Sequence, residues 1–385
     1  MLLIIKRGVG KIMEAWIRMP LRYLQVSRRA IAANYKAICD EVKVPVLAVI
    51  KGNAYGHGAV EVAKVLASAG ALWFGVEFLE EAIELRKNGI GQKILCLTGP
   101  ITLNDCQAFI EYDVIPSVYN TEAAMMLNSA AVEANKVIKV HLKFDTGMGR
   151  FGFTSENIYN AISDLKSLTN LEYEGAFTHF AAAFDAKPDY TLHQLAEFQK
   201  CLTALEDAGI NVRIRHAANS VGAMDFPQAR MDMVRVGGAL FGTSMFKNKH
   251  VRLEKVALLR AQLLEVRNVP KGAYIGYGHA YRASVSMKIG VIPLGYFEGL
   301  KVKRVNYAFH FSDLLRALYH DVLDYFRPQP VVFKESKPLD IVGRIGLQLS
   351  AVNVSGLDVK PGDEVNVAID PIYLDASIPR VYVDY

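Results

Sequence analysis

Short runs of β-branched and aromatic residues recur along the first two thirds of the chain, and helical patterns lie between them. The helical patterns include Ala59–Ala67, Glu80–Lys87, Thr121–Glu133, Glu156–Leu168 and Leu192–Ala208. We predict eight strands, at Val44–Lys51, Leu72–Phe78, Lys93–Thr98, Val114–Tyr119, Val137–Thr146, Tyr173–Phe180, Arg213–Ser220 and Met233–Phe241. Eight strands that alternate with helices predict an α/β fold, a (β/α)8 barrel of the TIM type. A doubly wound open sheet shares the alternation, but eight units favour closure.

From about Leu253 the pattern changes to alternating strands without regular helices between them. These strands are Val256–Val266, Val285–Pro293, Leu339–Ile345, Val352–Val354 and Val365–Ala368, and they predict an all-β C-terminal domain. One helix interrupts it, because Ser312 can cap an amphipathic segment that ends before Pro328. We therefore expect an N-terminal extension at 1–20, a barrel at 21–250, and a β domain at 251–385 with an inserted helix at 312–326.

The composition indicates which kinds of partner the protein can have and in which cell compartment it works. A chain of 385 residues suits one large domain plus a smaller one, and its formal charge of +5 is too mild to indicate a nucleic-acid partner. No apolar run approaches the ~20 residues of a membrane span. The first 30 residues are basic, as in a transit peptide, but serine is scarce, so we expect a cytoplasmic protein. The four cysteines lack metal-binding spacing and are predicted to be reduced core thiols, with no metal site.

The segment 46–58, Val-Leu-Ala-Val-Ile-Lys-Gly-Asn-Ala-Tyr-Gly-His-Gly, carries the first chemical signal. An apolar strand ends on Lys51, and a glycine-rich turn follows. Partial burial at the mouth of a strand lowers the pKa of a lysine and makes its amine a nucleophile. A lysine that merely extends to solvent from a strand end is the alternative.

Polar residues and glycines gather where other strands are predicted to end. They are Lys143, Asp145 and Arg150 after the fifth strand, His179 after the sixth, His216, Asn219 and Ser220 after the seventh, and Arg235, Gly237 and Gly238 after the eighth. Barrel enzymes build their active sites at this end of the strands. The Ser220 hydroxyl and the backbone N–H groups of Gly237 and Gly238 suit a phosphate. The structural alternatives are a helix cap, loop glycines, a core histidine at 179 and an ion pair of Arg235 with Asp232 or another carboxylate.

The segment 147–152 also matches the dinucleotide fingerprint Gly-x-Gly-x-x-Gly after a strand. It lies on the fifth unit rather than the first, and a dinucleotide site leaves Asp145 and Arg150 unexplained. We therefore favour the single-phosphate interpretation.

These motifs together resemble the alanine racemase family from about Leu21 to the C-terminus. The resemblance covers the Lys51 segment, Leu142–Arg150, Thr178–Phe180, His216–Ser220 and Met233–Gly238, and the segment Ile275–Tyr281 resembles the one that bears the second base of the family. It implies a barrel plus β domain, a head-to-tail homodimer, and racemisation of an amino acid, L-alanine to D-alanine, with pyridoxal 5'-phosphate. Lys51 would form the Schiff base and exchange the α-proton on one face, and Tyr277 of the partner subunit would do so on the other.

The resemblance also implies roles for the remaining site residues. His179 and Arg235 would form a relay behind Tyr277, and Arg235 would face the pyridine nitrogen. An arginine there leaves this nitrogen unprotonated and a poor electron sink, which restrains transamination. Arg150 would orient the cofactor ring and the substrate carboxylate, and Lys143 matches a lysine that is carbamylated in many members. Further cofactor contacts would come from Tyr55, Asn219, Ser220, Gly237, Gly238 and Tyr373.

The chain departs from the family pattern near the expected substrate carboxylate. The usual Gly-Arg-Val-x-Met-Asp-Gln becomes Gly-Arg-Ile-Gly-Leu-Gln-Leu at 343–349, so Leu347 and Gln348 replace methionine and aspartate. The usual Tyr-Ala-Asp-Gly becomes Tyr-Phe-Glu-Gly at 296–299. Substrate contacts are expected from Arg150, Tyr296 and Leu347. A racemase for another small or polar amino acid, a decarboxylase of the same barrel type and a non-catalytic cofactor-binding protein remain alternatives.

Overall fold

The computed structural model describes residues 20–184, 188–248, 250–303, 311–326 and 330–385, so the N-terminal extension expected at 1–20 lies outside them except for Pro20. The chain divides into two compact units. The barrel unit comprises Ser27–Ala257 and Tyr382–Tyr385, and the β unit comprises the residues up to Val26 and Leu258–Val381.

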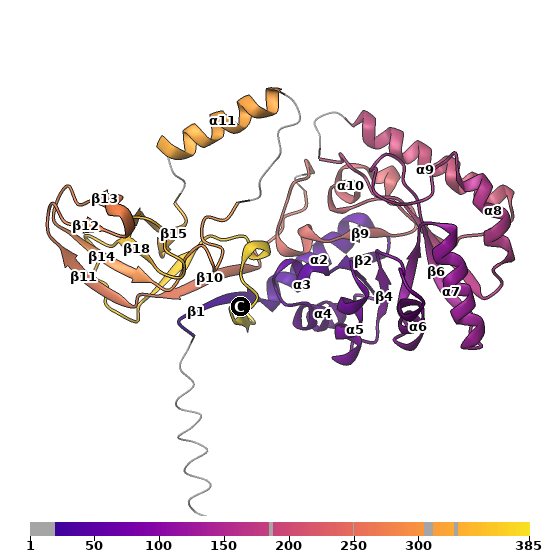
Figure 1. Cartoon of the computed structure of the whole chain (residues 1–385), viewed down its shortest axis with the longest axis horizontal. Coiled ribbons are helices and arrows are strands. Elements are labelled where there is room, and N and C mark those ends of the chain that lie inside the picture. Colours follow the sequence, from indigo (N-terminus) through magenta and orange to yellow (C-terminus); the bar gives the residue numbers. More distant parts are fainter. Residues whose placement is uncertain (1–19, 185–187, 249, 304–310, 327–329) are drawn as a thin grey trace, which may run out of the picture. The chain divides into compact units, whose positions relative to one another are not determined.

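Eight strands form the sheet of the barrel unit (Figure 1). They are β2 (Val46–Val49), β3 (Trp73–Val76), β4 (Lys93–Cys96), β5 (Ile115–Val118), β6 (Ile138–Lys143), β7 (Leu171–Phe177), β8 (Ile214–His216) and β9 (Val234–Val236). Neighbouring strands pair in parallel from β8 to β2, and β2 also pairs with β9. Backbone hydrogen bonds from Asp232 N to Arg215 O and from Arg235 N to Ala218 O join the two remaining ends (both 3.0 Å). The predicted strands and barrel are confirmed.

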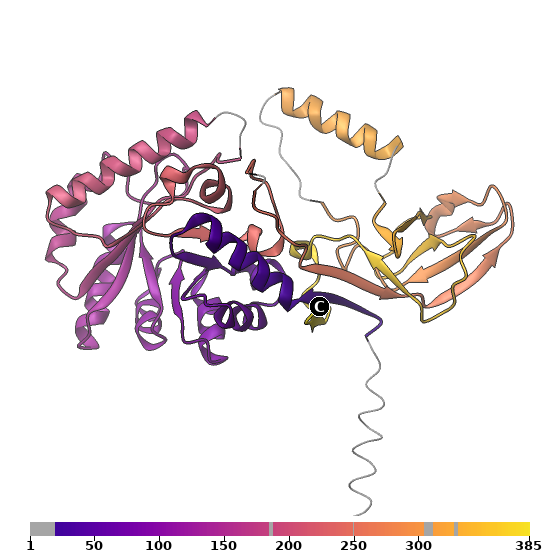
Figure 2. The same ribbon diagram turned by 180° about the vertical axis from the view of Figure 1, so that it is seen from behind.

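Helices alternate with these strands, and the longer ones lie on the outside of the sheet in both views (Figures 1 and 2). They are α2 (Arg28–Val42), α3 (Lys51–Tyr55), α4 (Ala59–Ser68), α5 (Leu79–Lys87), α6 (Leu103–Glu111), α7 (Thr121–Glu133), α8 (Ile158–Ser167), α9 (Asp189–Asp207) and α10 (Ser220–Asp225). The ends of these helices are determined by residues close to them in the sequence. The Asn120 side chain, for example, accepts a hydrogen bond from Ala123 N and caps α7. Helix α7 then buries a stripe that includes Ala123, Leu127 and Ala130, at helical spacing.

The β unit contains a six-stranded sheet in the order β16-β15-β19-β10-β1-β20, a four-stranded sheet β11-β14-β18-β17 and a hairpin β12-β13. Their bounds are β1 (Arg22–Ser27), β10 (Ala257–Gln262), β11 (Glu265–Val269), β12 (Tyr274–Ile275), β13 (Tyr281–Arg282), β14 (Met287–Ile292), β15 (Val332–Lys334), β16 (Lys337–Leu339), β17 (Ile341–Val342), β18 (Ser350–Asn353), β19 (Glu364–Val367) and β20 (Arg380–Val383). The inserted helix is present as α11 (Phe311–Phe326). The β character of this part of the chain is therefore confirmed.

One segment lies in a different unit from the one expected. Strand β1 comes first in the described chain, yet it pairs within the six-stranded sheet, between β10 and β20. Backbone hydrogen bonds hold it there, from Leu24 N to Pro379 O and from Gln262 N to Leu21 O (both 2.9 Å). Within the described ranges, the structure contains no helix that is long and apolar enough to cross a membrane.

Candidate active site

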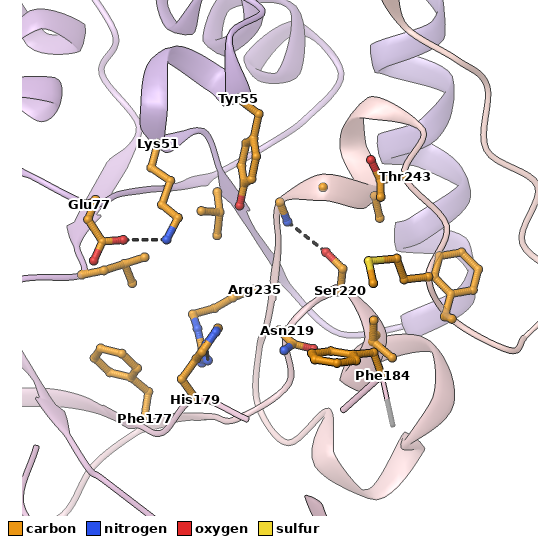
Figure 3. Close-up of a pocket in the computed structure, with 18 of the residues that line it drawn as sticks. Lys51, Tyr55, Glu77, Phe177, His179, Phe184, Asn219, Ser220, Arg235 and Thr243 are labelled. Atoms are coloured by element: carbon orange, nitrogen blue, oxygen red, sulfur yellow. Dashed lines mark hydrogen bonds and ion pairs between the residues drawn. The ribbon is translucent and has the colours of Figure 1, made fainter. Parts of the chain in front are cut away.

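A pocket of about 280 Å³ opens at the carboxyl ends of the barrel strands (Figure 3). Every barrel residue predicted to bind the cofactor or to act on the substrate lines it, namely Lys51, Tyr55, Lys143, Arg150, His179, Asn219, Ser220, Arg235, Gly237 and Gly238. They meet because parallel strands bring their carboxyl ends to one rim. Glu77, Phe184, Thr243 and Met245 also line the pocket and were not predicted.

Lys51 comes two residues after the end of β2 and begins α3. Its Nζ donates a hydrogen bond to Glu77 Oε2 (2.6 Å), drawn as a dashed line in Figure 3. The lysine side chain is 35% exposed, so the amine is partly buried and is accessible from the pocket. Glu77 follows β3 at the same rim, and a carboxylate next to a buried strand is the signal that would have identified it.

The turn after Lys51 is left-handed. Asn53, Ala54 and Tyr55 have φ of 53–54°, and Gly52 precedes them at 60°. A left-handed conformation costs about 1–2 kcal/mol for each non-glycine residue, so the surrounding contacts have to hold it. The Gly52 N–H donates to Glu81 Oε1 (2.6 Å), and Asn53 Oδ1 accepts from Ala59 N (2.8 Å). The result is that Tyr55 turns into the pocket (Figure 3).

Tyr55 meets the glycine loop after β9. A Cβ atom at Gly237 would lie 2.3 Å from the Tyr55 hydroxyl, so glycine is required there as long as the tyrosine keeps its position. The Gly237 N–H donates to Ser220 Oγ (3.1 Å), and Asn219 caps α10 by accepting from Gly222 N (2.9 Å). Two hydroxyl groups and glycine N–H groups thus gather at one side of the pocket, which is the donor set that a phosphate requires.

Arg235 is buried, with 3% of its surface exposed, and it lines the pocket. Its Nη1 and Nη2 groups donate to three backbone carbonyls, of Thr178, His216 and Ala217, at 2.6–3.0 Å. Nη1 also donates to His216 Nδ1 (3.0 Å), and Nη2 to His179 Nδ1 (3.3 Å). Burial lowers the pKa of Arg235 to about 9, so it remains a cation at neutral pH. The predicted alternative, an Arg235–Asp232 ion pair, is wrong, because Asp232 pairs with Arg215 (2.6 Å).

His179 lines the pocket next to Arg235 (Figure 3). Burial and the neighbouring Arg235 charge hold the pKa of His179 well below its usual range, so the ring is neutral. Because an arginine only donates, His179 Nδ1 is an acceptor and the ring proton resides on Nε2.

The loop after β6 folds around Asp145. The carboxylate accepts from the backbone N–H groups of Gly147, Met148, Gly149 and Arg150 at 2.8–3.0 Å. Burial alone would raise the pKa of Asp145, but these four donors together lower it. Most of the N–H groups of the Gly-x-Gly-x-x-Gly segment are therefore occupied by the chain's own carboxylate, which agrees with rejecting a dinucleotide site. The same bonds fix the backbone of Arg150, whose side chain reaches the pocket.

Lys143 lies at the end of β6 and is 3% exposed. Its Nζ donates to Leu97 O (3.0 Å) and lies 3.8 Å from the centroid of the Phe151 ring. The Arg150 guanidinium lies over the same ring, with Cζ 5.3 Å from the centroid. Burial, with a smaller contribution from the Arg150 charge, lowers the pKa of Lys143 to about 7.

Four predicted site residues lie in the β unit: Tyr277, Tyr296, Leu347 and Tyr373. Tyr277 begins a short 3-10 turn and is 76% exposed, and Tyr296 and Leu347 are also exposed. Backbone bonds from Tyr296 N to Gly346 O (3.2 Å) and from Phe297 N to Leu347 O (3.0 Å) join the two segments that carry them. Tyr373 ends a 3-10 turn, Pro371–Tyr373.

Both units match known families. The model described as "Alanine racemase, N-terminal domain" matches residues 26–245, and that described as "Alanine racemase, C-terminal domain" matches residues 256–375. The chain belongs to the alanine racemase family. An alanine racemase of Clostridium tetani is 34% identical over 335 residues, covering 86% of this chain and 80% of that protein. One of Methanococcus maripaludis is 33% identical and covers 90% of this chain and 88% of its own length.

Solved structures of the alanine racemase family agree. The alanine racemase of Clostridium difficile superimposes with a TM-score of 0.84 at 29% identity, covering 96% of this chain and 97% of that one. The Streptomyces lavendulae alanine racemase gives a TM-score of 0.82 at 27% identity, with 96% and 98% covered. As a member of the alanine racemase family, the chain is an enzyme of the amino-acid racemase class, and the predicted class of function is confirmed.

Proposed function

We propose that the protein interconverts L- and D-alanine with pyridoxal 5'-phosphate in the barrel pocket. One observation supports this proposal above all. A single pocket contains an accessible lysine amine, a set of hydrogen-bond donors suited to a phosphate, and a neutral histidine in contact with a buried arginine. The alanine racemases similar to this chain point to alanine as the substrate.

The pocket residues fit this cofactor at both of its ends. The Ser220 and Tyr55 hydroxyls and the N–H groups of Gly237 and Gly238 would bind the phosphate, with Asn219 beside them. Arg235 would face the pyridine nitrogen. Among the described residues, the acceptors that bind the guanidinium all contact Nη1 or Nη2, so we assign Nε–H to that nitrogen. When bound, the cofactor delocalises the electron pair that the substrate α-carbon keeps after losing its proton.

Lys51 and Tyr277 would move the α-proton on opposite faces of the substrate. Two bases invert a stereocentre without turning the substrate over. Tyrosine is a weak base at neutral pH because its unperturbed pKa is ~10. The His179 Nε2–H is a donor available to stabilise the Tyr277 phenolate, and the Arg235 cation lies behind it. Arg150, held by the Asp145 loop, would bind the substrate carboxylate.

Arg235 favours racemisation over decarboxylation. A decarboxylase needs a strong electron sink, hence a protonated pyridine nitrogen next to a carboxylate. Here the five acceptors of the guanidinium are three carbonyls and two neutral histidines. An arginine does not deliver a proton to the nitrogen, which supports the racemase.

The β unit would complete the site from a second copy in a head-to-tail homodimer. Tyr277 of the partner subunit is the second base in this proposal, and Tyr296 and Leu347 contact the substrate. Tyr373 remains a predicted phosphate ligand. The two departures from the family pattern contact each other, since the Gln348 side-chain amide donates to Glu298 Oε1 (3.1 Å). Glu298 is fully buried and also accepts from Arg22 Nη2 (3.1 Å). The carboxylate at 298 is kept as Glu298, and Gln348, which replaces an aspartate, is held by a hydrogen bond to it.

The test is incubation of the cofactor-loaded protein with L-alanine in deuterated water. We expect α-deuterium uptake and D-alanine formation together, measured by mass spectrometry after chiral separation. Uptake without D-alanine would contradict the two-base racemase while leaving Lys51 as a base. No uptake with L-alanine, but uptake with another amino acid, would replace alanine as the substrate.

Lys143 is expected to carry a carbamate. Its pKa of about 7 leaves much of the amine uncharged near neutral pH, and the uncharged amine is the form that reacts with carbon dioxide. The carbamate would attract Arg150 in place of the present repulsion. We expect a 13C-carbamate NMR signal with labelled bicarbonate that increases from about pH 6 to about pH 8, since the uncharged fraction rises through the pKa.

The matched control is Lys93, a second barrel lysine over an aromatic ring, with Nζ 4.5 Å from the Trp73 centroid. The signal should vanish in Lys143→Met and persist in Lys93→Met. Lys143→Met should also lose activity about tenfold or more, the scale of one charge-assisted hydrogen bond of ~1.5–3 kcal/mol. A signal that survives Lys143→Met would contradict the assignment.

A further inference from the structure

Three titratable side chains in the barrel interior move no proton in the mechanism above, and His216 appears there only as an acceptor for Arg235. His141 on β6 and His216 on β8 are fully buried, and Glu174 on β7 is 3% exposed. They continue the set of contacts that begins at Arg235. His216 Nδ1 lies 3.0 Å from Arg235 Nη1, His216 Nε2 lies 2.9 Å from His141 Nδ1, and His141 Nε2 lies 3.7 Å from Glu174 Oε2.

Both ends of this chain require the same direction for every hydrogen bond, because Arg235 only donates and the Glu174 carboxylate only accepts. An arginine donates only, so His216 Nδ1 is the acceptor and the His216 proton resides on Nε2. That proton is donated to His141 Nδ1, which leaves the His141 proton on Nε2. His141 Nε2 and Glu174 Oε2 face each other, and within the described residues neither has a hydrogen-bond partner inside ordinary bonding distance. Burial lowers the pKa of both histidines, so both rings are neutral.

The backbone is adapted to this arrangement. The β6–β7 pairing shifts register between Val140 and His141, which is a bulge. Gly175 lies beside the ring, and a Cβ atom there would come within 2.6 Å of His141 ring atoms. A glycine and a bulge at the same point make room for an imidazole inside the barrel.

Glu174 is fixed as an anion at the far end. Its Oε1 accepts from Lys139 Nζ (3.0 Å) and Lys93 Nζ (3.3 Å), which leaves Oε2 toward His141. Burial alone would raise the pKa of Glu174, but His141, Lys139 and Lys93 together lower it to about 2. The donors from Arg235 onward all point toward this carboxylate, and such a chain strengthens each of its bonds.

We propose that Glu174 and His141 are positioning residues that act through His216 on Arg235. They keep His216 Nδ1 an acceptor, and this acceptor holds the guanidinium in the orientation that faces the pyridine nitrogen. Only the statement that Arg235 faces the pyridine nitrogen rests on the proposed function. If the chain is broken at His141, His216 loses the acceptor for its Nε2 proton and can change tautomer, which would turn an N–H group toward Arg235.

The first experiment needs no activity. In 15N-histidine-labelled protein, we expect both rings as neutral Nε2–H tautomers from about pH 6 to about pH 9, assigned with His141→Asn and His216→Asn. An Nδ1–H tautomer or an imidazolium at either position would overturn the proposal.

The second experiment compares His141→Leu with His141→Asn and with Ser117→Ala. Asparagine retains an acceptor near the Nδ1 position, whereas leucine removes it. Ser117 is the β5 neighbour of His141 and donates to Cys96 O (2.6 Å), so its removal controls for loss of a buried hydrogen bond. We expect His141→Leu to lower kcat about three- to tenfold, the scale of one hydrogen bond, with little change in KM.

A second readout of the same variants separates positioning from general damage. Conversion of the bound cofactor to pyridoxamine phosphate by L-alanine, measured by chromatography, should rise several-fold in His141→Leu, because a displaced Arg235 no longer keeps the pyridine nitrogen unprotonated. His141→Asn should be intermediate, because it keeps an acceptor for His216 but loses the Nε2–H that faces Glu174, and Ser117→Ala should behave like the wild type. Equal values for all variants would overturn the proposal while the proposed function stands. A wild type that does not act on alanine would instead contradict the proposed function, and the tautomers would still decide the inference.

Discussion

Replacing Lys51 by alanine is expected to abolish covalent attachment of pyridoxal 5'-phosphate and to lower racemisation by at least ~10²–10⁴-fold, the contribution of a general base. Lys51 Nζ lies in the pocket together with the phosphate-type donor set and is partly exposed to it. Borohydride reduction followed by peptide mass spectrometry measures the attachment, and chiral analysis of alanine measures the activity.

The control for this variant is Lys64→Ala, which removes an exposed lysine paired with Glu61 on α4. It should keep both attachment and activity. Recovery of a reduced cofactor adduct on another lysine of Lys51→Ala, with racemisation retained, would show that Lys51 is not the residue that binds the cofactor.

Replacing Tyr277 by phenylalanine is expected to leave the cofactor bound and to stop proton exchange on one face. Loss of the hydroxyl removes one of the two bases, so racemisation should fall by ~10²–10⁴-fold, while α-deuterium exchange continues with one alanine enantiomer. Exchange from each pure enantiomer in deuterated water, followed by NMR, measures the two faces separately.

The matched control is Tyr274→Phe, three residues earlier on β12 and likewise exposed. Tyr274 packs against His279 with ring centroids 4.4 Å apart, so its variant tests for general disturbance of the same turn. If Tyr277→Phe racemises alanine at the wild-type rate, the second base is a different residue.

The barrel and its site could be predicted from sequence because both follow from local patterns. Each buried strand is a short apolar run, and the polar residue after it must lie at the rim where the strands end. This places Lys51, Lys143, His179 and Ser220 in one pocket without any knowledge of packing.

Features that depend on contacts between distant residues could not be predicted in this way. The pairing of Lys51 with Glu77 depends on side-chain reach across two strands, and the Gln348–Glu298 bond joins loops 50 residues apart. The left-handed turn at Asn53–Tyr55 contradicts local preference and exists because Glu81 and Ala59 bond to it. The buried chain from Arg235 to Glu174 has no sequence signature, since a single histidine on an apolar strand usually only packs in the core.

Strand β1 has a consequence for biosynthesis. It is the earliest described strand to leave the ribosome, yet its neighbours β10 and β20 begin at Ala257 and Arg380. Because contacts between residues far apart in sequence form slowly, this strand has to wait unpaired while the barrel is synthesised. The six-stranded sheet can be completed only after β20 has emerged. A chain interrupted shortly before Arg380 would therefore leave an exposed edge at β1, and such edges promote aggregation.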